Sequence, residues 1–325
     1  MKELSIIVPI YNVERYVYRC LESLFCQGLN DECFEIIIVN DGTKDNSMDI
    51  VQSFISKHSN IIVVNQENRG LSVARNNGLE HASGSYVMFV DSDDFIIENT
   101  LSVLLNKAHE ERVDMLVADY SKMRDEEEDK FNLNIDRNSY VSNMMIGREA
   151  FLSFFNPAQC FIWRTIYRKE FLDRNHLRFI PNIYFEDVPF TIECYLKVGN
   201  VLIYPLPFYV YRQHHNSIVS VVNKKKLLDF NFVIAYLWNI LNTEQLSKKE
   251  HQKLLDAIFV TFSIEIWYLS HEEEGYRHRQ QVVEDLKAKV PYLYFNNSFK
   301  QRFVSFFYNY FPYAYLWARS INLIK

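Results

Sequence analysis

The sequence predicts an α/β protein, with a mostly parallel sheet flanked by helices and a helical C-terminal region. In the first 120 residues, short continuous apolar runs alternate with amphipathic stretches. This alternation is typical of strands buried on both faces and of the helices that cover them. From residue 224 the apolar residues follow a helical spacing instead, as in Leu227, Phe230 and Val233. The chain has 325 residues, of which 48% are hydrophobic, and can bury a large core without disulfides.

The first 120 residues predict five strands, each a run of about five β-branched or aromatic residues. They cover residues 4–8, 35–39, 61–64, 86–90 and 115–118. Helices are expected between them, because apolar residues recur at i, i+3, i+4 and i+7. These cover residues 17–25, 50–55, 72–81 and 101–108, with Gly84 after the third and Asn99 as the expected cap of the last.

Residues 121–148 interrupt this periodicity, with an acidic run at 125–129, and are expected to form a solvated surface excursion. Residues 149–220 regain aromatic density, and 224–290 have helical spacing. The predicted organisation is a catalytic domain over residues 1–220, with halves of about 1–120 and 121–220. A helical region follows over 221–325.

Composition excludes several classes of partner and site. The formal charge is −6, so the basic excess typical of nucleic-acid-binding proteins is lacking. The five cysteines include no C-x-x-C pair, which predicts neither a disulfide framework nor a zinc site. No leader and no run of about 20 apolar residues are apparent, so we expect a cytoplasmic protein, soluble or peripheral to the membrane.

Polar loops follow four of the predicted strands. They are Pro-Ile-Tyr-Asn at 9–12, Asn-Asp-Gly-Thr at 40–43, Gln-Glu-Asn-Arg-Gly at 66–70 and Asp-Ser-Asp-Asp at 91–94. Parallel strands bring their carboxyl ends to one edge of the sheet, where helix amino termini also point. Four polar loops on one edge predict a crevice that suits a nucleotide.

The loop at 91–94 is the most specific of these features. Three carboxylates, Asp91, Asp93 and Asp94, follow a buried apolar run, and their mutual repulsion calls for a cation. Oxygen ligands suit Mg²⁺ or Mn²⁺, which would complete its coordination with phosphate oxygens and water. A solvated, capped turn is the alternative, and the position directly after a buried strand favours the metal.

Taken together, these motifs resemble family-two glycosyltransferases of the GT-A fold. The resemblance rests on four segments in order: Ser-Ile-Ile-Val-Pro-Ile-Tyr-Asn at 5–12, Val-Asn-Asp-Gly-Thr-Lys-Asp-Asn-Ser at 39–47, Asn-Arg-Gly-Leu-Ser-Val-Ala-Arg-Asn-Asn-Gly at 68–78 and Asp-Ser-Asp-Asp at 91–94. Recognisable motifs run from about residue 4 to 217. Asn40 and Thr43 depart mildly from the aspartate and serine that are common in the family.

The resemblance implies roles for the donor-side residues. Pro9 and Tyr11 would line the base and ribose pocket, and Asp41 would accept a hydrogen bond from the uracil imide, which favours a UDP-linked donor. The remaining implied donor and metal residues are Arg75 facing the nucleotide, Asp91 on the ribose and Asp93 on the metal. Each also has an ordinary structural interpretation, such as a turn-forming aspartate before Gly42.

An acidic pair at residues 186–187 is the expected source of the catalytic base. Glu186 and Asp187 stand among aromatic and apolar residues, where desolvation raises the pKa of a carboxylate and makes it a better base. The resemblance points to the same pair, with Asp187 as base and Glu186 near the metal or the acceptor. Alternatively, both acids simply start the helix at 188–198.

The segment 209–217 resembles the family's segment over the donor diphosphate. Arg212 would offset charge on the leaving diphosphate, and His214 or His215 would complete the metal shell, with His214 preferred. Trp163 would stack on an acceptor sugar or pack in the core. Similar enzymes often have Trp-Asn-Lys where this chain has Trp163-Arg164-Thr165, which puts the role of that lysine in doubt.

The last segment, 300–325, is rich in tyrosine, tryptophan and phenylalanine with basic flanks, and suits either a membrane interface or packing on protein. The expected function is metal-dependent, inverting transfer of a hexosyl or N-acetylhexosaminyl group from a UDP-sugar to a saccharide or lipid-linked acceptor. The implied setting is bacterial surface-polysaccharide or glycolipid assembly. Alternatives are a non-catalytic scaffold at the membrane, or a nucleotidyltransferase or dehydrogenase, which the glycine-free loop at 9–12 disfavours.

Overall fold

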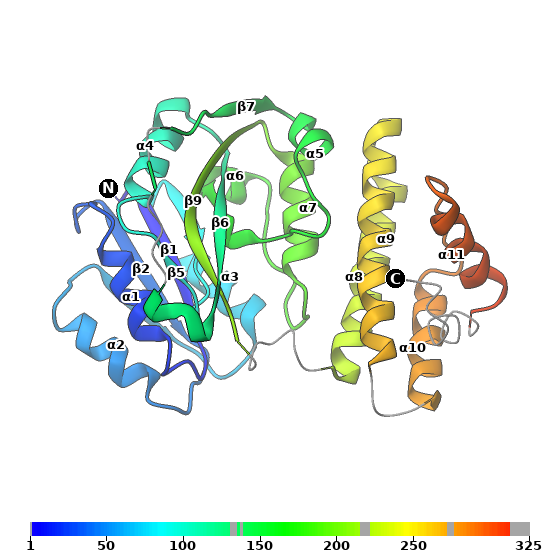
Figure 1. Ribbon diagram of the computed structural model, residues 1–325, viewed down its shortest axis with the longest axis horizontal. Coiled ribbons are helices and arrows are strands. Elements are labelled where there is room, and N and C mark those ends of the chain that lie inside the picture. The colour runs from blue at the N-terminus through cyan, green and yellow to red at the C-terminus, as the bar shows by residue number, and fades with distance from the viewer. Residues whose placement is uncertain (1, 131–134, 137–138, 215–221, 272–275, 313–325) are drawn as a thin grey trace. The chain divides into compact units, whose positions relative to one another are not determined.

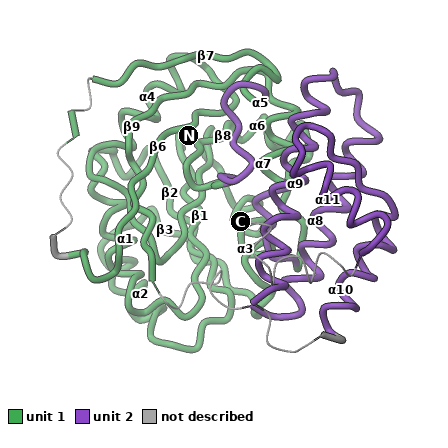
Figure 2. Tube along the Cα trace, turned by 45° about the vertical axis from the view of Figure 1, so that its right-hand side comes forward, with its two compact units in different colours: residues 1–150, 161–182, 190–216 green, residues 151–160, 183–189, 217–325 purple. Residues whose placement is uncertain are grey.

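The computed structural model describes residues 2–130, 135–136, 139–214, 222–271 and 276–312. The chain divides into two units (Figure 2), which are described separately. Unit 1 comprises Met1–Ala150, Phe161–Asn182 and Phe190–Asn216, and unit 2 comprises Phe151–Cys160, Ile183–Pro189 and Ser217–Lys325. Two short segments within the predicted catalytic domain thus belong to the helical unit.

Unit 1 is built on a mixed sheet that has nine strands within the described residues (Figure 1). The order is β3-β2-β1-β4-β8-β6-β9-β5, with β7 also pairing with β9. The first four strands along the order are parallel to one another: β3 (Ile61–Asn65), β2 (Phe34–Asn40), β1 (Leu4–Ile10) and β4 (Tyr86–Phe89). These match the predicted strands to within two residues, and the predicted fold class is confirmed.

The other half of the sheet contains the antiparallel pairings. β6 (Met115–Arg124) runs parallel to β9 (Asn200–Gln213), whereas β8 (Thr165–Arg168) lies antiparallel between β4 and β6. The short strands β5 (Phe95–Ile96) and β7 (Asn143–Ile146) pair antiparallel with β9. β6 extends six residues beyond its predicted end, because its second half pairs with β9.

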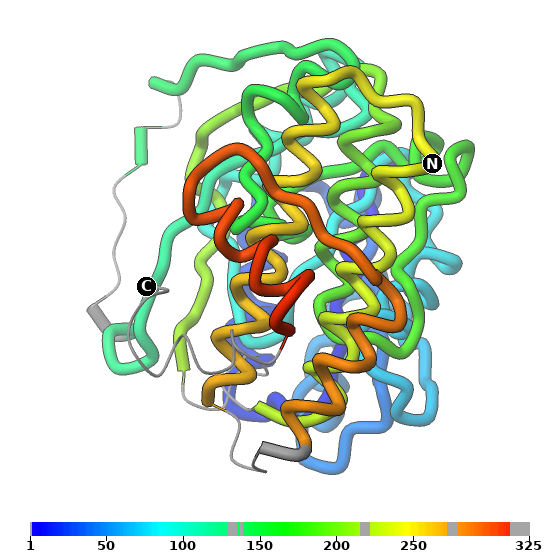
Figure 3. Tube along the Cα trace, turned by 90° about the vertical axis from the view of Figure 1, so that its right-hand side faces the viewer, coloured from blue at the N-terminus to red at the C-terminus, as the bar shows by residue number. Residues whose placement is uncertain are grey.

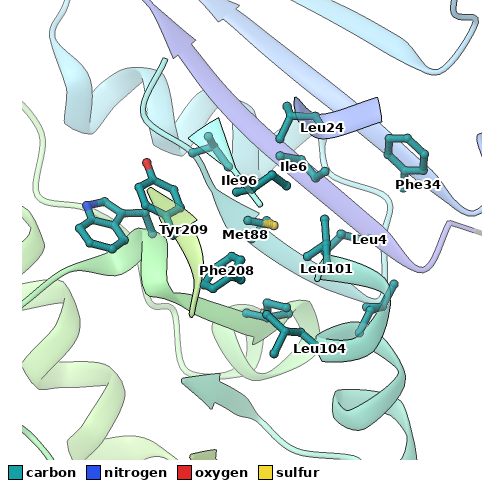
Figure 4. Close-up of a cluster of buried hydrophobic side chains, with 14 of the residues drawn as sticks. Leu4, Ile6, Leu24, Phe34, Met88, Ile96, Leu101, Leu104, Phe208 and Tyr209 are labelled. Carbon is teal, nitrogen blue, oxygen red and sulfur yellow. The ribbon is translucent and has the colours of Figure 1, made fainter. Parts of the chain in front are cut away.

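Helices cover the sheet because their apolar stripes face it. They are α1 (Val17–Phe25), α2 (Ser47–Ile55), α3 (Leu71–His81), α4 (Leu101–Glu111) and α6 (Lys169–Arg174). Two further helices, α5 (Glu149–Ser153) and α7 (Asp187–Lys197), contain residues of both units. Leu24 of α1 and Leu101 and Leu104 of α4 belong to one buried cluster with Leu4 and Ile6 of β1 (Figure 4). The predicted cap of α4 is wrong: Thr100 holds the N-cap position, and Asn99 lies before it with a left-handed φ of 55°.

Helix α3 approaches the sheet closely at Gly78. A Cβ atom there would lie 2.4 Å from Cγ2 of Ile7 in β1, so a larger residue would push the helix away. Arg75 stands one turn earlier on the same helix and is buried. The close approach therefore helps to bring the Arg75 side chain to the edge of the sheet.

The described part of unit 2 is mainly helical beyond residue 223, as expected for 224–290. Its helices are α8 (Lys224–Thr243), α9 (Lys248–Ser270), α10 (Tyr276–Lys289) and α11 (Phe299–Tyr310), and Figure 3 shows α8 to α10 running alongside one another. Asn223 caps α8, and Ser247 with Glu250 forms a capping box on α9. None of the described helices has the length and apolar character needed to span a membrane.

Candidate active site

The first two strands end in loops that are tied to each other. The backbone N–H of Asn12 donates to Thr43 Oγ1 at 2.7 Å, and Val13 N–H donates to Ser47 Oγ at 3.0 Å. Asp45 accepts from Glu14 N–H and from Ser47 N–H. Thr43, which replaces the common serine, thus keeps a hydroxyl that fixes the loop after β1.

Pro9 and Tyr11 occupy the end of β1. Pro9 is buried and pairs with Val39 of β2, beyond the point at which β4 stops pairing with β1. Its missing N–H therefore costs no ladder hydrogen bond on that side. Tyr11 is 44% exposed, so its ring has free surface at this edge. Their donor-binding roles stay predictions.

Asp41 is buried and orders the loop after β3. Its Oδ1 accepts from Gln66 Nε2 at 2.6 Å and from Arg69 N–H at 2.8 Å, while Oδ2 accepts from Gly70 N–H at 2.9 Å. This organising role was not predicted, because it joins residues about 28 positions apart. The predicted bond to a uracil imide would use a remaining lone pair of this carboxylate.

Arg75 and Asp91 form an ion pair at the edge of the sheet, in which Arg75 is buried and Asp91 is partly exposed. Arg75 Nη2 lies 2.7 Å from Asp91 Oδ1, and the Arg75 side chain is 3% exposed. Burial raises the pKa of Asp91, the Arg75 cation opposes this, and the Asp93 carboxylate adds to it. Two residues that the sequence assigned separately to the donor thus act on each other.

Asp94, which the sequence placed in the acidic loop without a role, anchors that loop. Its Oδ2 accepts from the Tyr209 hydroxyl at 2.8 Å, and its Oδ1 accepts from the backbone N–H of Arg212 at 2.7 Å. Burial, and then the carboxylates of Asp93 and Asp91, raise the pKa of Asp94 well above its usual range. These contacts fasten β9 to the loop after β4.

Asp93 and His214 form the pair best suited to a metal ion. Asp93 Oδ2 lies 2.9 Å from His214 Nε2, and the Asp93 side chain keeps 32% of its surface exposed. His214 also packs on the Tyr16 ring, at 4.9 Å between centroids. His215 lies outside the described residues.

The donor set fits Mn²⁺ or Mg²⁺. The Asp93 carboxylate and the His214 imidazole already lie side by side. The carboxylates of Asp91 and Asp93 raise the pKa of Asp94, and a cation bound nearby would oppose this rise. Among the described residues, no three His, Cys, Asp or Glu side chains are grouped to hold a metal. Two protein ligands, with the remaining positions left to phosphate and water, are what such an ion commonly uses.

Arg212 is buried and paired with the acidic run of residues 125–128. Its guanidinium donates to both oxygens of Glu128, at 2.6 and 2.9 Å, and to Asp125 at 3.0 Å, while its Nε donates to the backbone oxygen of Asp93 at 2.9 Å. The hydrogen bonds from Arg212 lower the pKa of the Glu128 carboxyl below its ordinary value. The role of Arg212 toward a diphosphate stays a prediction.

The prediction of a solvated excursion at 121–148 holds only in part for its described first residues, because Glu126 and Glu127 are exposed whereas Asp125 and Glu128 pair with Arg212. Residues 125–130 form a short 3₁₀ helix, η1 (Asp125–Lys130), that follows directly on β6. Asp125 is only 14% exposed, and it pairs with Arg15 at 2.8 Å as well as with Arg212. A run of acidic residues predicts a solvated segment. The sequence of the run does not show that Arg212, a buried residue on the distant strand β9, pairs with it.

Trp163 packs in the core of unit 1. It is 4% exposed and stacks on Tyr209 and on Phe161, at 4.3 and 4.9 Å between centroids. This geometry favours the core alternative over stacking on a sugar. Its neighbour Arg164 donates from Nε to the Ala118 carbonyl at 2.9 Å, which ties the short 3₁₀ turn η2 (Ile162–Arg164) to β6.

Glu186 and Asp187 lie in unit 2, at the start of α7. Glu186 is buried, Asp187 is half-buried, and Phe185 before them has a left-handed φ of 62°. Phe185 stacks on Phe230 of α8 at 3.8 Å, which holds this strained turn in place. After burial itself, the Asp187 carboxylate is the group that raises the pKa of the Cys160 thiol. The catalytic roles of the pair stay predictions.

Comparison with known proteins places this site in a family. Residues 5–174, just over half of the chain, match the profile described as Glycosyl transferase family 2. Uncharacterized glycosyltransferase EpsJ of Bacillus subtilis is 32% identical over 68% of this chain and 64% of its own length. Glycosyltransferase GlyA of Streptococcus pneumoniae is 33% identical over 69% of this chain, but over only 32% of its own length.

Solved structures share the fold. TarS of S. aureus, residues 1–349 in complex with UDP, superposes with a TM-score of 0.70 at 24% identity, covering 89% of this chain and 81% of that one. The matched residues include the loops after β1, β2, β3 and β4, and with them Asp41, Arg75, Asp91, Asp93 and Asp94. The chain therefore belongs to glycosyl transferase family 2.

Proposed function

We propose that the protein transfers a sugar from a UDP-sugar to a hydroxyl of a saccharide or lipid-linked saccharide, with Mn²⁺ or Mg²⁺ as cofactor. The observation that carries this proposal is the loop at 91–94. Asp91 bonds to the Arg75 cation and Asp94 to the Tyr209 hydroxyl, whereas the partner of Asp93 is His214, an imidazole that can itself bind a metal, and the Asp93 side chain is 32% exposed.

The donor side is argued from the loops after the first three parallel strands. Tyr11 offers an exposed ring, and Asp41 offers a fixed carboxylate between two such loops. A ring for stacking and an acceptor for an imide N–H suit a uracil base. TarS, which shares the fold, was solved with UDP and with UDP-GlcNAc, and this supports a UDP-sugar here.

Asp93 and His214 would hold the metal. A divalent cation at this place would neutralise charge that develops on the leaving diphosphate. The protein's own contribution is positioning: Arg212 donates to the Asp93 carbonyl, and its backbone N–H holds Asp94, so the loop and the end of β9 are fixed together. A mannosyltransferase of the same general fold, solved with GDP-Man and Mn²⁺, supports a divalent ion.

Asp187 would accept the proton of the attacking hydroxyl, with Glu186 beside it near the acceptor or the metal. The attacking oxygen would displace the diphosphate in one in-line step, which inverts the anomeric carbon. Half-burial of Asp187 favours a carboxylate that can work as a base. We propose that the reaction serves bacterial surface-polysaccharide or glycolipid assembly and takes place in the cytoplasm. The name of one relative, Minor teichoic acid biosynthesis protein GgaB of Bacillus subtilis, supports a surface polymer.

A thermal-shift panel tests the donor and the metal together. UDP, GDP and CDP are each added with and without Mn²⁺, because a ligand of the folded state raises the unfolding midpoint. UDP with Mn²⁺ should stabilise the protein more than either alone and more than the other nucleotides. Equal response to every nucleotide would remove the donor assignment.

Turnover separates an enzyme from a non-catalytic scaffold. Hydrolysis or transfer of a UDP-sugar with Mn²⁺ is expected from the wild type and should be lost in Asp93→Ala and Asp187→Ala. Glu126→Gln, an exposed acid near the site, is the matched control and should turn over normally. Donor binding without any turnover would favour the scaffold.

A further inference from the structure

Helix α11 directs most of its rings outward, although two of its four buried residues, Gln301 and Ser305, are polar. Its buried residues are Gln301, Val304, Ser305 and Tyr308, whereas aromatic residues at 299, 303, 306, 307 and 310 follow the spacing of the opposite face. Folding normally buries aromatic side chains, because water disfavours apolar surface. The outward position of most rings of α11 therefore needs an explanation.

The inward face is held by specific hydrogen bonds. Ser305 Oγ accepts from Phe295 N–H at 2.6 Å, and Asn309 accepts from Leu293 N–H at 3.1 Å and donates to its carbonyl at 2.7 Å. Gln301 donates to Asp256 of α9 at 2.9 Å. These bonds fix the rotation of α11 about its axis, so the outward direction of the rings is built into the fold.

The outward rings form one continuous surface, here called the aromatic face. Phe299 is 78% exposed, Phe306 50%, Tyr310 65% and Phe311 53%. Phe303 and Phe307 are half-buried and link them, with ring centroids 4.4 Å apart, and Phe306 lies 5.2 Å from Tyr310. A contiguous apolar surface of this kind is typical of an interaction site rather than of scattered surface residues.

The sequence around α11 is basic. Residues 286–325 contain six lysines and arginines and no aspartate or glutamate, in a chain whose net charge is −6. Lys300 and Arg302 are exposed on α11 itself. This end of the chain is therefore complementary to an anionic surface, although the chain as a whole is acidic.

We propose that the aromatic face binds the surface of a lipid bilayer that contains anionic lipids. Exposed rings enter the headgroup region of such a surface, and adjacent lysine and arginine residues pair with phosphate headgroups. Helix α11 has 12 residues, which is too short to cross the bilayer, so it lies along the surface. This proposal does not rest on the donor or on the transfer reaction.

Sedimentation of the full chain with vesicles tests the proposal. The wild type should bind phosphatidylcholine vesicles containing phosphatidylglycerol and bind pure phosphatidylcholine weakly. Phe299→Ser with Phe306→Ser should lose most of this binding, because two exposed rings are removed. Tyr18→Ser, a 51% exposed ring on α1, is the matched control and should bind as the wild type does.

A second variant tests the contribution of the basic side chains and leaves the aromatic rings in place. Lys300→Gln with Arg302→Gln should weaken binding about tenfold at low salt, with the difference shrinking as salt screens the charges. Lys248→Gln with Lys249→Gln, both exposed at the start of α9, should leave binding unchanged. Unaltered unfolding midpoints would show that the variants remain folded, as their exposed positions predict.

Three outcomes would overturn the proposal. The first is failure of the wild type to bind vesicles of either composition. The second is vesicle binding that persists in the ring variant. The third is a wild-type dimer, seen by light scattering, that Phe299→Ser with Phe306→Ser dissociates, because the aromatic face would then be covered by a second copy of the chain. Donor stabilisation by UDP should be unchanged in every variant, which separates this proposal from the proposed reaction.

Discussion

Glu128 and Arg212 are joined by two hydrogen bonds, of 2.6 and 2.9 Å, across 84 positions of the sequence. Arg212 in turn donates to the backbone oxygen of Asp93. An acid on the 3₁₀ turn η1 therefore positions the cation on β9 that holds the proposed metal-binding loop. Glu128 would be a positioning residue, because it acts through Arg212.

Glu128→Gln should lower both stability and donor affinity. The amide cannot accept two charge-assisted bonds, so we expect a loss of about 1 kcal/mol in the free energy of unfolding, discounted for the partial exposure of Glu128. The KM for the donor should rise several-fold more than kcat falls. Unfolding curves and initial rates measure both effects, and Glu126→Gln on the same turn should change neither.

His214→Gln should weaken the response to metal. Loss of the imidazole beside Asp93 should weaken Mn²⁺ binding. The Mn²⁺ concentration that gives half-maximal stabilisation in the presence of UDP should rise about 10–100-fold. The measurement is the unfolding midpoint as Mn²⁺ is titrated at fixed UDP. His251→Gln, exposed on α9, is the control. An unchanged Mn²⁺ requirement in His214→Gln would exclude this histidine as a ligand.

Asp187→Asn should separate chemistry from binding. If Asp187 accepts the acceptor's proton, kcat should fall about 10²–10⁴-fold. Stabilisation by UDP and Mn²⁺ should stay as in the wild type, because Asp187 would touch neither. Glu193→Gln, on the same helix and paired with Lys197, should keep kcat within a few-fold. Normal turnover by Asp187→Asn would show that Asp187 is not the base, and Glu186 would then be the next residue to test.

The parallel half of the sheet could be predicted because its signal is local. The strands at Leu4–Ile10 and Phe34–Asn40 are continuous apolar runs, and the stripe from Val17 to Phe25 matches α1 residue by residue. The antiparallel strand β8 was missed, since Thr165–Arg168 is only four residues long and pairs with strands about 50 and 80 positions away.

The residues of the site could be named from motifs, but not how they pair. Asp91, Arg75 and Asp41 stand in recognisable segments, whereas the Arg75–Asp91 ion pair and the Asp41 contacts to Arg69 and Gly70 depend on the fold. The burial of Trp163 was left open for the same reason. Its stacking partner Tyr209 arrives from a strand that follows it by more than 40 residues.

Asp45 provides a pH-dependent test of the loop clamp after β1 and β2. Burial alone would raise the pKa of Asp45, but hydrogen bonds from Ser47, from the backbone N–H of Glu14 and from Thr43 outweigh it and lower the pKa below its ordinary value. The folded state thus favours the ionised carboxylate. The stabilisation is complete above the unfolded pKa of about 3.9 and is lost as the pH falls through the lower folded value.

Asp45→Asn should therefore destabilise the protein at neutral pH but not in acid. We expect a loss of about 0.5–1 kcal/mol in the free energy of unfolding between pH 5 and 7, typical of losing a side chain that caps a helix start. The difference from the wild type should shrink steadily as the pH falls below about 4, and should vanish once the pH lies below the lowered pKa of the folded state, where Asp45 is protonated in both states. Glu80→Gln, an exposed acid on α3, should show no such difference. Urea unfolding at several pH values measures this, and a difference that grows toward acid would mean that the clamp stabilises the neutral carboxyl instead.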